Sequence, residues 1–158
     1  MNHSEIACPE CKAINSLGHI AQELRVSVGE KTVKATQHLS KCNECGFHEV
    51  SALDAELLQM RAALTVLREC GAPTPAVLKF ARKALGLRQS DVTAQLGYVA
   101  ETVSRIETGG IPAPAPYAPA LGGLLERAIV LRLGGDPDFV VERASPEEQR
   151  EQRISQTG

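Results

Sequence analysis

The 158-residue sequence has few aromatic side chains, only 3% of its residues, and no apolar run near the roughly 18 uncharged residues that a membrane helix needs. Its first residues, MNHSEIACPECK, contain neither the basic nor the apolar region of a secretory signal. A P-loop, a Gly-rich dinucleotide turn and a catalytic triad are also missing. We therefore expect a cytoplasmic, non-enzymatic protein with no catalytic or cofactor-binding residues and no membrane partner.

Cysteines are scarce as well: there are five, an odd number and too few for a disulfide framework. Four of them form two CxxC pairs, Cys8 and Cys11 in CPECK and Cys42 and Cys45 in CNECGF. A thioredoxin-like redox motif is expected once, so two copies favour a tetrahedral zinc site over free or redox thiols. We predict one structural Zn²⁺ per chain, because four thiolates leave no open position for a catalytic water.

The 30 residues between the two pairs leave room for the two strands of a zinc ribbon. Residues 23–28 alternate polar and apolar side chains, residues 31–39 form the second expected strand, and Gly29-Glu30 predicts the turn. We expect Cys70 to be a half-buried apolar residue rather than a ligand. Four histidines are expected to be solvated: His3, His19, His38 and His48.

Residues 51–71 predict a helix that joins the zinc module to the rest of the chain. Ser51, with Asp54 three residues later, resembles a capping box. Gly71 is expected at the C-terminal end, where the prolines that follow stop the helix. Apolar residues recur on one face at spacings of four and three: Leu53, Leu57, Met60, Leu64 and Leu67.

Residues 75–109 predict three short helices, which Gly86, Gly97 and Gly109 end. The second and third, in RQSDVTAQLG and AETVSRIETGG, are joined by a tight turn with glycine. This arrangement is typical of a helix-turn-helix, whose second helix lies in the DNA major groove. The expected inward residues are Val77, Leu78, Ala81, Leu85, Val92, Leu96, Val103 and Ile106.

The stretch LRQSDVTAQLGYVAETVSRIETGG resembles the XRE/Cro-type helix-turn-helix of phage repressors and bacterial regulators, on Gln89, Leu96-Gly97 and residues 104–109. The order of CxxC pairs, connecting helix and this motif is similar to the MqsA family of type II antitoxins, over roughly residues 8–133. The resemblance implies that the zinc domain binds a cognate toxin. It also implies that the C-terminal domain dimerises and binds its own operator.

Residue by residue, the resemblance implies a phosphate contact by Gln89, base contacts by the first residues of the third helix and guanine recognition by Arg105. Glu101 departs from the family, in which an asparagine reads adenine. A carboxylate can accept from cytosine N4 instead, or pair with Arg105 four residues on. Solvated surface charge is the alternative for Arg105. The predicted DNA-binding set is Gln89, Ser90, Ala100, Glu101, Thr102, Ser104 and Arg105.

The charge distribution gives only modest support for nucleic-acid binding. The net charge is −2, with five basic against three acidic residues from 75 to 108, and three against six from 136 to 158. One copy would bind DNA weakly through phosphates alone, which predicts a homodimer on a two-fold site. The apolar residues between 121 and 131 are expected to serve either the core or a dimer face.

These patterns predict an α+β protein. Its expected parts are a zinc-ribbon-like β domain (1–50), a connecting helix (51–72), an all-α XRE/Cro-type helix-turn-helix domain for DNA binding and dimerisation (73–135) and a mobile acidic tail (136–158). The predicted function is that of a transcriptional repressor of antitoxin type, which binds double-stranded operator DNA as a dimer and a toxin through the zinc domain. The alternative is a stand-alone prophage-type or redox- or metal-responsive repressor without a toxin.

Overall fold

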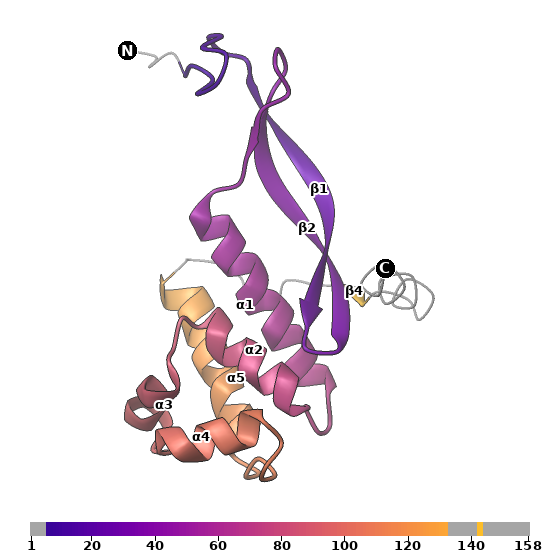
Figure 1. Ribbon diagram of the computed structural model, residues 1–158. Coiled ribbons are helices and arrows are strands. Elements are labelled where there is room, and N and C mark those ends of the chain that lie inside the picture. The colour runs from indigo at the N-terminus through magenta and orange to yellow at the C-terminus, as the bar shows by residue number, and fades with distance from the viewer. Residues whose placement is uncertain (1–5, 133–141, 144–158) are drawn as a thin grey trace.

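A computed structural model describes residues 6–132 and 142–143 of the chain. The protein is α+β, as predicted: a long antiparallel hairpin precedes a body of helices (Figure 1). The strands are β1 (Leu17–Val28), β2 (Lys31–Cys42), β3 (His48–Glu49) and β4 (Glu142–Arg143). The helices are α1 (Ala52–Glu69), α2 (Pro75–Ala84), α3 (Gln89–Leu96), α4 (Ala100–Glu107) and α5 (Tyr117–Arg127), and a π-helical turn, Ala128–Arg132, continues α5.

Of the predicted tail (136–158), the structure describes two residues. Glu142 and Arg143 form β4, which pairs with β2 at Lys34 and Val33. The rest of 136–158 lies outside the described residues, as does His3. Within the ranges 6–132 and 142–143, every helix is too short or too polar to cross a lipid bilayer.

The hairpin keeps one unbroken register, from Leu17 opposite Cys42 to Val28 opposite Lys31. Both strands are longer than the predicted ranges, and the turn lies at the predicted Gly29-Glu30. Gly29 occupies the first of the two turn positions with φ +61°, which matches the glycine preference of a type II′ turn. The longer strands carry the two CxxC pairs toward the open end of the hairpin, away from this turn (Figure 1).

The closed end of the hairpin packs against the N-terminus of α2. A Cβ on Gly29 would lie 2.8 Å from the backbone nitrogen of Val77, so a larger residue does not fit there. The Glu30 carboxylate accepts a 2.6 Å hydrogen bond from the hydroxyl of Thr74, the N-cap of α2. Side chains of the hairpin, α1 and α2 form a small shared core: Val28, Val33, Ala35, Ala62, Val66 and Val77. This core crosses the predicted boundaries at 50/51 and 72/73.

Helix α1 begins as predicted, since Ser51 Oγ accepts from the backbone N–H of Asp54 at 3.0 Å. Its end differs from the expectation. Cys70 is already extended, so the chain leaves the helix without a left-handed residue, and Gly71 has no positive φ. Leu53 is exposed because the first turn of α1 extends beyond the helices that cover the rest of the predicted face.

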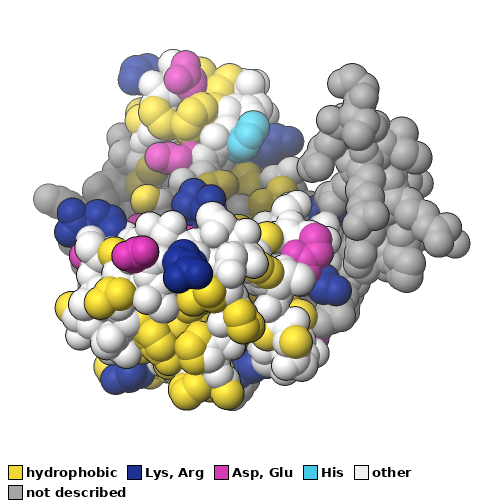
Figure 2. All heavy atoms as spheres, turned by 60° about the horizontal axis from the view of Figure 1, so that its bottom comes forward, with side chains coloured by type: hydrophobic (Ala, Val, Ile, Leu, Met, Phe, Trp, Pro, Cys, Tyr) yellow, Lys and Arg dark blue, Asp and Glu magenta, His cyan; other side chains and the backbone are white. Residues whose placement is uncertain are grey.

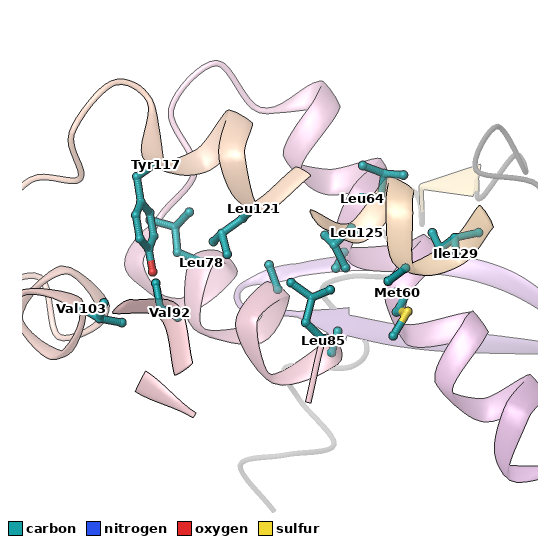
Figure 3. Packing of buried hydrophobic residues seen from close by; sticks show 14 of the residues in the cluster. Met60, Leu64, Leu78, Leu85, Val92, Val103, Tyr117, Leu121, Leu125 and Ile129 are labelled. Carbon is teal, nitrogen blue, oxygen red and sulfur yellow. The ribbon is translucent and has the colours of Figure 1, made fainter. Parts of the chain in front are cut away.

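The main core lies where the five helices α1 to α5 meet (Figure 3). Helix α5 begins at Tyr117, inside the Pro-rich segment, because proline is tolerated in the first turn of a helix. Most apolar residues between 121 and 131 serve this core, whereas Val130 and Leu131 stay exposed. The buried members from α5 and the following turn are Tyr117, Leu121, Leu125, Ala128 and Ile129.

Tyr117 carries a polar atom into this core. The side chain is fully buried, its ring meets Tyr98 edge-on at 5.2 Å, and its hydroxyl has no hydrogen-bond partner among the described residues. Burial raises the pKa of Tyr117 to about 12, and the nearby Glu107 charge acts in the same direction. An unpaired buried hydroxyl costs free energy, so this residue offers a test of the packing.

We expect Tyr117→Phe to raise the free energy of unfolding by about 1 kcal/mol at pH 8, because it removes the unsatisfied hydroxyl. The variant should also change the alkaline limb. Between pH 10 and 12 tyrosine ionises in the unfolded chain but not in the fold, so the wild type loses stability as the pH rises. Urea unfolding at pH 8 and pH 11 measures both effects. Equal losses in the two proteins would mean that Tyr117 is not protected from ionisation.

Candidate functional site

The four cysteines of the CxxC pairs come together at the open end of the hairpin. Their sulfur atoms all lie within 4.8 Å of one another, with Cys8 Sγ 3.7 Å from Cys45 Sγ and Cys11 Sγ 3.7 Å from Cys42 Sγ. A regular tetrahedron with metal–sulfur bonds of about 2.3 Å has edges of about 3.8 Å. The cluster therefore has the size and donor set of a four-thiolate metal site, as the cysteine spacing predicts.

Both CxxC segments use the same backbone turn. The N–H of the residue after the second cysteine donates to the carbonyl of the first: Lys12 to Cys8 at 3.0 Å and Gly46 to Cys42 at 3.1 Å. Both donors lie in the left-handed region, Lys12 with φ +62° and Gly46 with φ +78°. Glycine adopts this conformation without a steric cost, whereas lysine does so against its preference. The repeated turn points all four thiols toward one centre.

The surroundings of the cluster favour thiolates at some positions and oppose them at others. A hydrogen bond with Ser16, 3.1 Å from Cys42 Sγ, and backbone bonds from Cys45 and Glu44 lower the pKa of Cys42 to about 6. At Cys11 a backbone bond from Ala13 favours the thiolate, yet desolvation and the three neighbouring thiols raise its pKa to about 12. Four thiolates this close need a cation between them, because like charges at this distance oppose ionisation.

The other expected thiol and imidazole positions lie apart from this cluster. His19, His38 and His48 are exposed, as predicted, and Cys70 is half-buried at the end of α1. The metal-ligand set of the described residues is therefore four sulfurs, with no imidazole among them.

The second site is the helix pair α3 and α4. Gly97 ends α3 in the left-handed conformation with φ +80°, and α4 begins at Ala100 after an extended Val99. The residues predicted to face inward do so: Val92, Val103 and Ile106 are buried. The short turn between the helices and the buried side chains of α4 leave the other side of α4 open to solvent.

The predicted DNA-binding residues fall into two groups. Ser90, Glu101 and Arg105 are exposed, and Glu101 and Arg105 form no ion pair with each other among the described residues. Ala100, Thr102 and Ser104 are half-buried. Gln89 is also half-buried, and its side-chain amide donates to Glu107 Oε2 at 3.2 Å. Its amide is thus engaged inside the protein.

A buried ion pair holds the helix pair in place. Arg82 of α2 and Glu107 of α4 are each 7% exposed and form two hydrogen bonds, Nε to Oε1 at 2.5 Å and Nη2 to Oε2 at 3.0 Å. Arg82 Nη1 also donates to the carbonyl of Leu87 at 2.6 Å. One guanidinium therefore connects α2, the segment before α3 and the end of α4. The hydrogen bond with Glu107 raises the pKa of Arg82.

Arg82 is not among the residues that the sequence predicts for either site. The available signal was its position, since Arg82 directly follows Ala81 on the apolar stripe of α2. A charged residue beside a buried stripe calls for a partner of opposite charge. Glu107 is that partner.

The surface at the α3–α4 end has a mixed character. In Figure 2, which looks onto this end, the Lys and Arg side chains are separated from one another and a broad hydrophobic area lies among them. Val99 contributes an apolar side chain here that is 57% exposed. Arg88 is held by Asp91, whose carboxylate accepts from its backbone N–H at 2.7 Å and from its guanidinium at 3.1 Å. The guanidinium of Arg88 lowers the pKa of Asp91.

In comparisons with known proteins, no family profile and no curated protein matches this chain. The likeness to XRE/Cro-type domains and to MqsA antitoxins therefore rests on the motifs and their order.

Proposed function

We propose that the protein is a DNA-binding transcriptional repressor in which α4 enters the major groove. The observation that carries the proposal is the side of α4 that is open to solvent. Glu101 and Arg105 are exposed there and form no ion pair with each other among the described residues. The buried Arg82–Glu107 pair fixes that helix, so its side chains are held ready for base contacts. In this reading the domain is of XRE/Cro type.

The chemistry of the exposed side chains gives the expected contacts. Arg105 suits guanine O6 and N7, and Glu101 suits the amino group of cytosine. Ala100, Thr102 and Val99 would approach bases at the start of the helix, where apolar side chains favour the methyl group of thymine. Ser90, Ser104 and the start of α3 at Gln89 would lie near phosphates. Because positive charge is sparse, two copies on a two-fold site are needed for firm binding.

The cysteine cluster serves this function as a structural zinc site. Four thiolates in a closed tetrahedron are typical of zinc centres that stabilise a fold rather than catalyse a reaction. Cys8, Cys11, Cys42 and Cys45 would hold one Zn²⁺ per chain.

The metal end also has features of a protein-docking surface, in line with an antitoxin. Ile6 and Ile14 are 62% and 56% exposed there, and the backbone N–H of Asn15 donates to the carbonyl of Ile6. Exposed apolar side chains that lie together favour a protein partner. Co-expression with the product of the adjacent gene and size-exclusion chromatography distinguish the candidates. A stable complex supports an antitoxin, whereas a chain that ignores its neighbour favours a stand-alone repressor.

Arg105→Ala tests the DNA-reading role. On a duplex selected from a random library by the wild type, the variant should lose about 1–3 kcal/mol of binding free energy and its preference for a guanine. Binding to unrelated DNA should change little. Lys41→Ala, an exposed lysine on the hairpin, is the charge-matched control. Fluorescence anisotropy measures the affinity of the wild type and of both variants for the selected duplex and for unrelated DNA. Unchanged affinity and base preference in Arg105→Ala would remove α4 as the reading helix.

A further inference from the structure

The outer edge of β1 is the exposed feature that neither the metal site nor the helix pair uses. The sheet order is β1-β2-β3, and β4 also pairs with β2, so no described strand lies along the outer side of β1. The strand is 12 residues long, keeps its register without a bulge and contains no proline. Natural edge strands are usually short, bulged, covered or broken by proline, because an open edge pairs with other chains.

The register of the hairpin fixes which residues offer backbone groups at this edge. In a two-residue turn, the flanking pair, here Val28 and Lys31, exchanges both hydrogen bonds. Alternate residues back along β1 then bond to β2. The residues between them, including Glu23 and Arg25, direct their N–H and C=O outward. An incoming antiparallel strand would bond to these positions.

The side chains at these outward positions are self-complementary. Glu23 and Arg25 flank Leu24, and a two-fold axis at Leu24 places Glu23 of each copy directly opposite Arg25 of the other. Glu23 and Arg25 both direct their backbone groups outward, so each Glu23–Arg25 pair across the two copies is a backbone hydrogen-bonded pair. Leu24 of one copy lies opposite Leu24 of the other in a non-hydrogen-bonded pair. Opposite charges directly across an antiparallel ladder stabilise it, and like charges destabilise it.

The local charge pattern agrees with this register. Within one copy, Arg25 stands opposite Lys34, and the Glu23 carboxylate lies 3.9 Å from Lys34 Nζ with its side chain 67% exposed. The pairing brings a further carboxylate, Glu23 of the other copy, beside Arg25. On the other face, Ile20 and Leu24 provide partly exposed apolar side chains that a second strand would cover.

The edge is accessible on both sides of Leu24. Ala21, Gln22, Glu23 and Arg25 are all exposed. In Figure 1, the half of β1 nearer the cysteine end forms the outer border of the hairpin, with β2 between it and α1.

We propose that two copies of this chain join by antiparallel pairing of their β1 edges about Leu24, which makes one continuous sheet across the dimer. The pairing supplies an interface for the dimer that DNA binding calls for, yet it does not depend on DNA. Arg105→Ala should leave the dimer intact, so a failure of the DNA proposal and a failure of this one are distinguishable.

Charge reversal tests the proposal. Glu23→Lys sets the new lysine against Arg25 of the second copy, and Arg25→Glu sets two carboxylates against each other. Each single variant should weaken dimerisation about tenfold or more in sedimentation equilibrium at 50 mM salt, where surface charges are screened less than at physiological salt. Glu49→Lys, the same change on β3 away from this edge, is the matched control and should keep the wild-type dimer.

Mixing the two single variants tests this register specifically. In an equal mixture of the two single variants, every charged pair of the heterodimer is complementary, so the mixture should dimerise more tightly than either variant alone. The double variant Glu23→Lys/Arg25→Glu should dimerise with itself for the same reason. Circular dichroism and metal content confirm that each variant is folded. Three results would overturn the proposal: a monomeric wild type, a dimer whose affinity neither single reversal changes, or a mixture that dimerises no more tightly than the single variants.

Discussion

Replacing Glu107 with glutamine is expected to lower the free energy of unfolding by about 3–5 kcal/mol, a large part of the stability of a domain this size. The glutamine keeps the shape of the side chain but removes its charge. Arg82 would then stay buried, 7% exposed, with its cation uncompensated. Gln89 would also lose a charged acceptor. Chemical denaturation followed by circular dichroism measures the change.

Glu126→Gln provides the comparison. The Arg68–Glu126 pair has the same atom-to-atom distance, 2.5 Å, but its side chains are 43% and 47% exposed. Exposed pairs contribute only about 0–1 kcal/mol, so this variant should unfold much like the wild type. Similar losses in both variants would mean that burial of the Arg82–Glu107 pair does not matter.

A double replacement separates the cost of an unpaired charge from the value of the pair. Arg82→Met with Glu107→Leu removes both charges and keeps apolar volume, so much of the loss seen in Glu107→Gln should be recovered. A double variant as unstable as Glu107→Gln, with no recovery, would show instead that the pair itself supplies the stability.

Removing the Zn²⁺ that we propose for the cysteine cluster is the second change with a large expected effect. Binding of zinc by thiolate sites in small peptides is worth about 10–16 kcal/mol, and that free energy folds the peptide. The cysteine end has little apolar packing of its own, whereas the helices share a separate core. Chelation should therefore unfold residues 6–16 and 42–49 and leave α1 to α5 helical. Amide hydrogen exchange should show protection falling about 100-fold or more in the cysteine end.

Single cysteine replacements identify the ligands in the same assay. Cys42→Ser should release the metal, and Cys70→Ser, half-buried at the end of α1, should retain it. Acid should act like chelation, because ligands must be deprotonated and metal affinity falls as the pH falls. Loss of helical signal on chelation would contradict the expectation that the helical core stands without the metal.

The sequence predicts those features whose causes are local. Each CxxC turn is closed by a hydrogen bond within five residues, so its spacing alone indicates the cluster at Cys8 and Cys42. The helix ends at Gly86 and Gly97 follow from the left-handed conformation that glycine accepts, and both residues have positive φ. The α+β class and the four-cysteine cluster are confirmed, whereas the contacts of Glu101 and Arg105 with DNA stay predictions.

The remaining features depend on residues far apart in the sequence. Gly29 and Val77 meet because the hairpin turn and α2 share a core, and no periodicity in either segment indicates the other. Arg82 and Glu107 are 25 residues apart and come from different helices. Such pairings are set by how whole elements pack, and a single sequence carries no direct record of them.

The anchoring of the hairpin turn on α2 has a mechanical consequence. A 12-residue strand at about 3.3 Å per residue reaches about 40 Å, so the cysteine end is the far tip of a long arm whose base is clamped by Gly29 and Glu30. By that geometry a rotation of about 5° at the base moves the tip by about 3.5 Å. Small adjustments where Thr74 meets Glu30 would thus be magnified at the tip. Conversely, a protein that binds the tip would exert a torque on the start of α2, the helix that carries Arg82.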